Sequence, residues 1–516
     1  MRIGFASIYS WRPHVEHLYY LASLAKAGGH EVAYLTCDAD LPDCYARELL
    51  RQRPGLLHCT LCRLAGIRSY ANASVSAIGR FAGDGDALHA AARDWSRSSA
   101  GTLGRFESPA EFSSPEFDAI AARLSPAVAK TYWATRRWIE HERLDALCAF
   151  NGRLDVTRAL LEAARDAGIR YLSMERTWFG DGLQLLPDED CIGLKSVDSM
   201  VDAFADVPLG QDQALRAARH MASRFLRRNK TEWRAYNVSA TATPWPANGS
   251  RRILLVPGSR NEVWAHPDWA SGWAQVTDAF DALIDHWQLK AADLVLRCHP
   301  NWAQNIGSVS GERSERYFVD WAQRRGICVV PSSASVSTQG LMEQADTVVA
   351  SGGSAGVDAG ILGKRVIAIA PSVYQRAGFQ DTVYKADDIG RLDSAGLPPE
   401  RIARQTLRFC YTMIYRIPQY VDYVRCVTTT KYDYLDGADP ARLGELLRTG
   451  SLQPDDPLGA ADRAGEADVL KRLDDRRWED LLGSVPEQVG TLRPLRRRWM
   501  YRPLARLREA LPRGDL

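Results

Sequence analysis

The sequence lacks the features that would place the chain in a membrane or on a nucleic acid. No stretch reaches the roughly 18 consecutive apolar residues of a membrane-spanning helix, and the opening residues, MRIGFASIYSWRP, lack the apolar run of a signal peptide. The 65 basic and 63 acidic residues nearly cancel, which argues against a general nucleic-acid binder. We therefore expect a cytoplasmic protein, and the 516 residues predict two or three domains.

The stretch DTVVASGGSAGVDAGILGKRVIAIAP, residues 346–371, carries the clearest local pattern. Residues 347–350 predict a buried parallel strand, 355–362 a short helix, and 364–369 the next strand. The small residues between the first strand and the helix favour an anion site, because backbone N–H groups and the helix dipole attract negative charge there. A tight turn in any doubly wound sheet fits equally well. It is not a Walker A loop, since no Ser or Thr follows Lys364.

Strands and helices alternate through both halves of the chain, which is typical of α/β proteins with doubly wound parallel sheets. We expect a domain over 1–240, a second over 250–432, and a linker with a basic tail over 433–516. Residues 70–114 predict a helix or two and a mobile loop, 211–237 long basic helices, and 398–423 helices that cross back to the first domain. The predicted strands are 2–7, 31–36, 145–150, 169–174, 253–256, 293–297, 327–330, 347–350 and 364–369.

Polar residues follow the predicted strands of the first half, at the sheet edge where open α/β folds bind ligands. A carboxylate beside an arginine, as at Glu175 and Arg176, suits an acid/base or acceptor-binding pair, although a surface ion pair also fits. We expect Glu175 to be the catalytic carboxylate, ahead of Asp181, Glu16 and Asp155. The other acceptor-side candidates are His14, Asn151 and Arg153.

Three loops of the second half, at Ser259-Arg260, His299 and Ser354, are expected to meet at one sheet edge. The segments LVLRCHPN (294–301) and VVPSSASVSTQGLMEQADTVVASGGSAGVDAGILGKRVIAIAPSVY (329–374) resemble the C-terminal domain of bacterial capsule and surface-polysaccharide glycosyltransferases, and are similar to the capsule-type Kdo transferases. That family carries a His-Pro pair after a strand, then a Ser/Thr-x-Gly-x-Glu-Ala segment and Gly-Lys-Pro-Val.

The resemblance implies a GT-B fold, two facing Rossmann-like domains with an interdomain cleft, and a metal-independent enzyme. It places His299 at the donor phosphate, Ser354 in the small-residue loop and Asp358 on the ribose of a nucleotide sugar. Two residues depart from the family pattern: Asp358 stands where Glu is usual, which puts the ribose contact in doubt, and Arg365 stands where Pro is usual. The similarity covers roughly residues 252–374.

Four cysteines form a C-x6-C-x14-C-x2-C array in one loop-rich stretch. Four thiolates suit a tetrahedral structural zinc, although the first gap is wider than usual. Ordinary thiols are the alternative reading. The array comprises Cys37, Cys44, Cys59 and Cys62.

The sequence therefore predicts a glycosyltransferase that moves a sugar from a nucleotide sugar to a glycan or glycolipid acceptor. A teichoic-acid-type polyol-phosphate transferase and a nucleotide-sugar epimerase are alternatives, because fold does not fix function. A non-catalytic scaffold of a polysaccharide export assembly is an alternative of another class. Residues 491–516, arginine-rich with Trp499, Met500 and Tyr501 interleaved, predict either a weak peripheral contact with an anionic membrane surface or a solvated tail.

Overall fold

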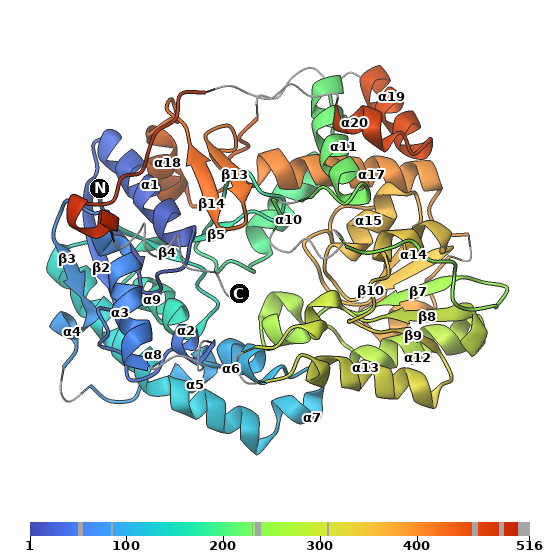
Figure 1. Ribbon diagram of the computed structural model, residues 1–516, viewed down its shortest axis with the longest axis horizontal. Coiled ribbons are helices and arrows are strands. Elements are labelled where there is room, and N and C mark those ends of the chain that lie inside the picture. The colour runs from blue at the N-terminus through green and yellow to red at the C-terminus, as the bar shows by residue number, and fades with distance from the viewer. Residues whose placement is uncertain are drawn as a thin grey trace.

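The chain forms two α/β domains that lie side by side, each built on a six-stranded sheet (Figure 1). The computed structural model describes residues 1–49, 55–83, 86–229, 231–232, 239–306, 309–393, 395–456, 463–483 and 490–503. Each strand predicted above is present, with its ends within two residues of the predicted ones. The predicted fold class, two Rossmann-like domains in the GT-B manner, is confirmed.

The first sheet has the strand order β3-β2-β1-β4-β5-β6. Its first five strands are parallel and β6 pairs antiparallel with β5. The strands β3 and β6 carry too little periodicity to be predicted. The sheet comprises β1 (Arg2–Ser7), β2 (Glu31–Thr36), β3 (Val75–Ala77), β4 (Ala146–Phe150), β5 (Arg170–Arg176) and β6 (Leu183–Pro187).

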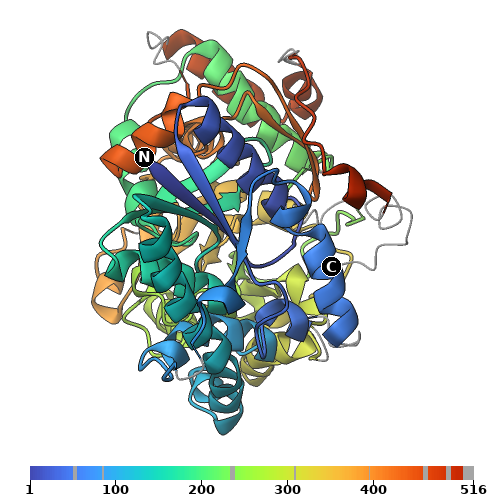
Figure 2. The ribbon, with the colours of Figure 1, turned by 90° about the vertical axis from the view of Figure 1, so that its left-hand side faces the viewer.

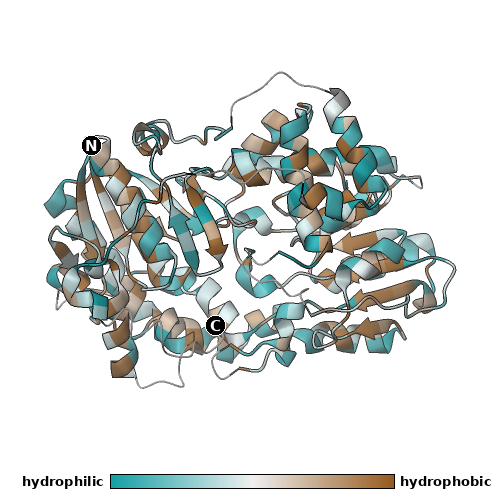
Figure 3. Ribbon diagram, turned by 45° about the horizontal axis from the view of Figure 1, so that its top comes forward, coloured by the Kyte–Doolittle hydropathy of each residue, from teal (hydrophilic) through white to brown (hydrophobic). Residues whose placement is uncertain are grey.

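The second sheet is parallel throughout, in the order β12-β11-β10-β7-β8-β9. Successive residues of a strand point to opposite faces, so Leu254 joins one buried cluster while Ile253 and Leu255 join another. Burial on both faces explains why these strands are continuous apolar runs, which appear brown in Figure 3. They are β7 (Ile253–Val256), β8 (Leu294–Arg297), β9 (Cys328–Val330), β10 (Thr347–Ala350), β11 (Arg365–Ala368) and β12 (Asp381–Thr382).

Helices connect the strands and cover both sheets. In the first domain they are α1 (His14–Ala27), α2 (Tyr45–Leu49), α3 (Gly55–Ala65), η1 (Ile67–Ser69), α4 (Ile78–Phe81), α5 (Ala92–Trp95), α6 (Arg97–Gly104), α7 (Pro109–Phe112), α8 (Pro115–Glu142) and α9 (Asp155–Asp166). In the second half they are α10 (Lys195–Phe204), α11 (Gln211–Phe225), η2 (Arg260–Glu262), η3 (Pro267–Trp269), α12 (Val276–Trp287), η4 (Ala291–Asp293), η5 (Pro300–Ala303), α13 (Glu312–Arg324), α14 (Thr338–Gln344), α15 (Ala355–Ile361), α16 (Ala386–Ile389), α17 (Pro399–Tyr411) and the π-helix η6 (Thr412–Arg416).

After η6 the chain returns to the first domain. The hairpin β13 (Val424–Thr428) and β14 (Lys431–Tyr434) and the helix α18 (Ala441–Thr449) pack into the first domain's core. The prediction of a linker from residue 433 is therefore corrected: Leu443, Leu446 and Leu447 bury one face of α18, and the surrounding acidic, Gly- and Pro-containing sequence hid this short amphipathic pattern.

The last elements alternate between the domains. The helices α19 (Arg463–Asp474) and α20 (Trp478–Leu482) bury Val469, Leu473 and Leu481 with α10 and α11 in the second domain's core. Residues 490–503, with the short helix η7 (Trp499–Tyr501), then return to the first domain, where Asp436 N–H donates to the Thr491 carbonyl at 2.9 Å. Residues 484–489 and 504–516, part of the predicted linker and tail, lie outside the described residues.

Candidate active site between the two domains

The strand order reverses at one point in each sheet, between β1 and β4 and between β7 and β10. The loops that leave such a pair diverge, which opens a place for a ligand at the carboxyl ends of the strands. The two reversal points face each other, because the Arg153 guanidinium, after β4, donates to the carbonyl of Glu262, after β7, at 3.2 Å. The predicted residues that belong to these two loop sets are His14, Asn151, Arg153, Ser259, Arg260 and Ser354.

Glu175 lies within β5 rather than after it, because the pairing of β5 with β6 extends the strand to Arg176. Its Oε2 accepts a hydrogen bond from Asn151 Nδ2 at 3.0 Å, and its Oε1 accepts one from the backbone N–H of Arg176 at 2.9 Å. The side chain is 23% exposed. Burial nevertheless raises the pKa of the Glu175 carboxyl, and Arg176 opposes this shift only in part. A carboxyl of this kind suits general base chemistry near neutral pH.

His14 lies beside Glu175 at the start of α1. Its ring rests on Phe150 with 4.1 Å between the ring centroids, and its Nδ1 is 3.5 Å from Glu175 Oε1. The ring is buried, and Nδ1 has no hydrogen-bond partner among the described residues. Burial, together with the charge of Arg176, lowers the pKa of His14 well below its usual value. A neutral histidine thus adjoins Glu175, with one ring nitrogen directed toward the carboxylate.

Arg176 is held by the returning hairpin. Its guanidinium donates to the Thr429 carbonyl at 2.9 Å, beyond the end of β13. The hairpin is fixed in turn by His17, whose Nδ1 is 2.9 Å from the Tyr434 hydroxyl and whose ring meets Tyr432 edge-on at 4.6 Å. No local pattern marks this contact, since it joins residues about 250 or more positions apart.

On the second domain, the loops after β7 and β8 are joined by hydrogen bonds. Trp302 Nε1 donates to Ser259 Oγ at 2.6 Å, and His299 Nδ1 accepts from the backbone N–H of Asn301 at 3.1 Å. The second bond caps η5 and leaves the proton of a neutral His299 on Nε2. The Arg260 guanidinium lies over the Trp264 ring, 5.0 Å from its centroid.

The contacts of Ser354 and Asp358 differ from those predicted. Arg224 of α11 donates to Asp358 Oδ1 at 2.8 Å and to Oδ2 at 2.9 Å, and Gln339 also donates to Oδ2 at 2.8 Å. The same guanidinium donates to Ser354 Oγ at 3.1 Å. Asp358 is buried and serves as an anchor for α11, so its predicted role at the ribose is not supported. Arg224 was not predicted, because nothing local marks it as the partner of a carboxylate 134 residues away.

The other three carboxylates predicted as catalytic candidates have structural roles. Asp181 accepts from the backbone N–H of Cys426 at 2.8 Å and fixes the hairpin. Glu16 accepts from the Tyr70 hydroxyl at 2.6 Å and pairs with Arg12 at 3.1 Å. Because Glu16 is two residues after His14 on the same helix, the two side chains lie on different faces of that helix. Asp155 is buried against the Tyr9 hydroxyl and the backbone N–H of Tyr45. Glu175 is therefore the best placed of the four.

The four cysteines of the predicted zinc site do lie together. They line one small cavity of about 30 Å³ beside Ile8 and Tyr9. However, among the described residues no three His, Cys, Asp or Glu side chains are arranged to hold a metal ion. Burial raises the pKa of the Cys37 thiol to about 11 and that of Cys44 well above its usual value. The residues present thus do not fit the predicted zinc.

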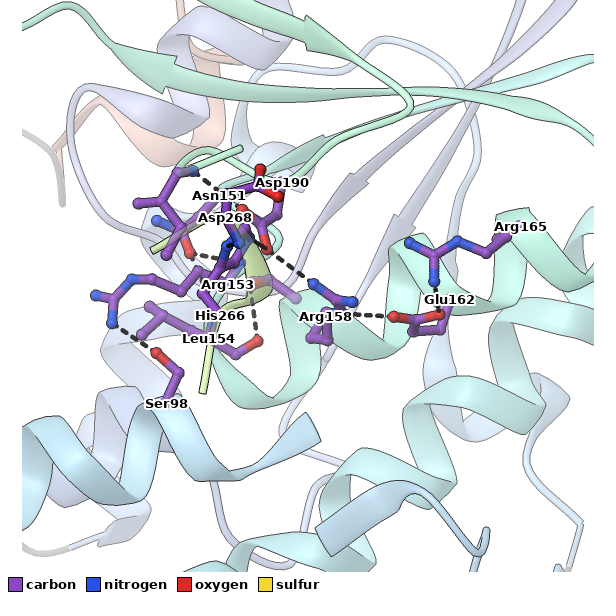
Figure 4. A network of polar contacts seen from close by, with 12 residues as sticks. Ser98, Asn151, Arg153, Leu154, Arg158, Glu162, Arg165, Asp190, His266 and Asp268 are labelled. Atoms are coloured by element: carbon purple, nitrogen blue, oxygen red, sulfur yellow. Dashed lines mark hydrogen bonds and ion pairs between the residues drawn. The ribbon is translucent and has the colours of Figure 1, made fainter. Parts of the chain in front are cut away.

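A network of charged residues joins the domains next to the site (Figure 4). Asp190, after β6, lies 3.3 Å from Nε2 of His266 in the second domain and accepts from Arg158 at 2.8 Å. Arg158 also pairs with Glu162, which accepts from Arg165. The contacts with His266 and Arg158 hold the pKa of the Asp190 carboxyl below its usual value despite its burial.

The segment 97–117, which we name the crossing segment, forms the second contact between the domains. The sequence predicted a helix or two and a mobile loop over residues 70–114; the helices α6 and α7 of this stretch reach the second domain (Figure 1). Arg105 donates to the Asn301 carbonyl at 2.8 Å, and Phe112 stacks on Trp264 with 4.0 Å between ring centroids. Its small residues permit close approach: a Cβ on Gly101 would lie 3.0 Å from the Asn261 carbonyl oxygen. The crossing segment therefore rests directly on the predicted donor loops.

Comparisons with known proteins give only distant likenesses. No family model matches the sequence, and no curated protein matches it. Among solved structures, Thermosulfurimonas dismutans KpsC, a beta Kdo 2,4 transferase, is 14% identical, with 64% of this chain and 87% of that chain covered and a TM-score of 0.33.

Two further solved structures are of other kinds. UDP-GlcNAc 2-epimerase of Methanocaldococcus jannaschii is 9% identical, covering 76% of this chain and 90% of that one, with a TM-score of 0.27. The glycosyltransferase SnogD of Streptomyces nogalater is 15% identical, covering 80% and 94%, with a TM-score of 0.23. Such likenesses decide nothing about function, which has to be inferred from the chain's own residues.

Proposed function

We propose that this chain is a glycosyltransferase that moves a sugar from a nucleotide sugar to a glycan or glycolipid acceptor, of the capsule or O-antigen kind. The observation that supports it best is the position of Glu175. This carboxyl has a raised pKa, adjoins the buried His14, and stands at the edge of the first sheet, whose loops touch the predicted donor loops of the second domain.

The second domain would bind the donor. Sugar transfer requires the leaving nucleotide phosphate to be neutralised. Arg260 carries a positive charge, and His299, whose Nδ1 accepts from the backbone N–H of Asn301, would present its ring proton at Nε2. Backbone N–H groups of the small-residue loop 351–354 would add further donors. In this proposal the phosphate is neutralised by the chain's own residues, without a metal ion.

The first domain would bind the acceptor. As a general base, Glu175 takes the proton of the acceptor hydroxyl while that oxygen bonds to the sugar carbon and the carbon–phosphate-oxygen bond breaks. Asn151 and Arg176 hold its two oxygens in place. In a retaining enzyme Glu175 would instead attack the sugar carbon itself. Trapping a covalent sugar on Glu175 would distinguish the two mechanisms.

The test is to incubate the protein with CMP-, UDP- and GDP-sugars and to measure thermal shift and donor hydrolysis. We expect one nucleotide sugar to stabilise the protein and to be hydrolysed slowly. The variant Glu175→Gln should lose the hydrolysis but keep the stabilisation. Turnover of a CDP-polyol would indicate the polyol-phosphate transferase instead. An epimerised sugar released without acceptor would indicate the epimerase. Binding of no nucleotide at all would favour the scaffold and contradict the proposal.

The proposal also includes a peripheral location at the inner face of the cytoplasmic membrane. None of the helices among the described residues has the length and apolar character to span a bilayer. Contact would therefore be made from the surface, and the predicted basic tail is one part of it: Trp499 is 76% exposed.

A further inference from the structure

The exposed apolar side chains are concentrated on one part of the first domain. In the described part of the chain, nine large hydrophobic residues are exposed, and five of them belong to α3 and to residues 492–500. Single exposed apolar residues are ordinary, but a cluster indicates an interaction surface. The five are Leu56, Leu57, Leu492, Trp499 and Met500.

The helix α3 is unusual for a surface helix. Of its 11 residues, GLLHCTLCRLA, only Ala65 is buried. The side that holds Cys59 and Cys62 faces the small cavity beside β1. Leu57, Leu61 and Leu64, spaced four and three residues apart, share the opposite side, and none of them belongs to a hydrophobic core cluster or packs against one. Leu57 is exposed and Leu61 and Leu64 are half-buried, so the described chain covers the apolar side of α3 only in part.

Arg497 fixes the tail against the end of this helix. Its guanidinium donates to the Ala65 carbonyl at 3.2 Å and to Ser69 Oγ at 2.7 Å, and it lies over the Tyr70 ring at 4.4 Å. The next residue, Arg498, donates its backbone N–H to the Ser69 carbonyl at 2.8 Å. Figures 1 and 2 show the short helix 499–501, in red, on the same side of the domain as α3. Trp499 and Met500 are therefore held beside α3 rather than on a loose tail.

The charge of this region is positive. Between residues 490 and 503 there are five arginines and no acidic residue. Arg496, Arg498 and Arg502 are exposed, and none of these three has an acidic partner among the described residues. Arg63 of α3 is 55% exposed but pairs with Asp38 at 3.0 Å, so the unpaired positive charge comes from residues 496–502. Exposed leucine and tryptophan side chains surrounded by arginines match the interface of an anionic bilayer, where apolar groups enter the acyl boundary and arginines meet the headgroups.

We infer that α3 and residues 492–502, together named the docking face, bind an anionic lipid bilayer. The docking face adjoins the site, because Cys59 and Cys62 line the same cavity as Ile8 and Tyr9, which directly follow β1 and precede His14. If the proposed function holds, the acceptor is a lipid-linked glycan presented from that bilayer to Glu175. Binding to the bilayer itself does not depend on the enzymatic activity.

Co-sedimentation of the full-length protein with vesicles tests the inference. Vesicles of phosphatidylcholine with phosphatidylglycerol should bind the protein, and vesicles of phosphatidylcholine alone should bind it much more weakly. The double variants Leu56→Glu/Leu57→Glu and Trp499→Ser/Met500→Ser should each lower binding roughly tenfold or more, and Arg496→Gln and Arg498→Gln about fivefold each. Leu88→Glu is the matched control, since Leu88 is also exposed, at 62%, but lies outside the docking face.

Unchanged binding in both double variants, or an equal loss in Leu88→Glu, would overturn the inference. Loss of binding only when residues 504–516 are deleted would place the contact elsewhere and overturn it too. Thermal unfolding of each variant shows whether it is folded. Because sedimentation requires no turnover, a failure here leaves the proposed function standing. Conversely, a protein that binds vesicles but transfers no sugar would contradict the proposed function alone.

Discussion

The carboxylate of Glu107 accepts a hydrogen bond from the backbone N–H of Arg260 at 2.7 Å, and this bond joins the crossing segment to the first loop of the second domain. Asn261 Nδ2 donates to the other carboxylate oxygen at 2.6 Å. Glu107 is fully buried. Burial outweighs these hydrogen bonds and raises the pKa of the Glu107 carboxyl to about 8.

The first prediction is a pH dependence of folding stability. Because the folded pKa of about 8 exceeds the usual value of 4.5, the folded state holds this proton more tightly than the unfolded state. The stabilising contribution is complete below pH 4.5 and is lost as pH rises through 8. In Glu107→Gln this titration is absent. Urea unfolding of both proteins at pH 5 and pH 8 should show a smaller pH effect in the variant; equal pH effects would contradict the shifted pKa.

The second prediction concerns Glu175. Glu175→Gln keeps the shape of the side chain and removes its charge, so it should lower the turnover rate about 100-fold or more, as the loss of a general base does. Donor affinity should hardly change, since the donor loops belong to the other domain. The wild-type rate should rise with pH through a pKa above 4.5, because the base acts when ionised and burial raises its pKa. Glu140→Gln, which removes an exposed carboxylate of α8, is the control.

Normal turnover in Glu175→Gln would transfer the role to another carboxylate. Loss of donor binding in that variant would instead contradict the division of tasks between the domains. Steady-state kinetics with varied donor, at pH values from 5 to 9, separates these outcomes.

The third prediction concerns His299. Its Nδ1 caps η5, while its Nε2 is the proposed phosphate contact. His299→Asn can still cap the backbone N–H of Asn301 but is too short to reach the phosphate. His299→Ala should therefore lose both donor affinity and some stability, whereas His299→Asn should lose donor affinity alone. Calorimetric titration with the nucleotide and thermal unfolding measure the two effects. Full donor affinity in His299→Asn would remove His299 from the donor site.

The fourth prediction concerns Arg224 and Asp358. Removing one partner of a buried ion pair leaves the other uncompensated, which typically costs about 3–5 kcal/mol. Arg224→Met should therefore strongly destabilise the protein in urea unfolding, and so should Asp358→Asn. The double variant should lose less than the sum of the two single losses. If Asp358→Asn instead leaves stability intact and weakens nucleotide binding, Asp358 contacts the ribose, as the family resemblance implied.

Much of the fold could be predicted from the sequence because its signals are local. Continuous apolar runs such as 253–256 and 347–350 mark strands buried on both faces, and small or polar residues after them mark the loops where the strands end. The sequence predicted Glu175 just after its strand, whereas β5 continues through Glu175 to Arg176, so that Glu175 lies near the carboxyl end of the strand. The candidate site was thus predictable as far as it depends on strand ends.

The tertiary structure alone decided which polar groups pair. Asp358 had the local setting of a ribose ligand, but Arg224, 134 residues away, occupies both of its oxygens. Glu107 lies in a stretch rich in Ala, Ser and Gly with no clear period, and its role depends on meeting Arg260, 153 residues along the chain. Local sequence determines whether a segment becomes a strand or a helix. The pairing of charged groups depends on which segments the folded core brings together. Burial then makes the loss of either partner costly in free energy, because a buried charge without its partner is strongly unfavourable.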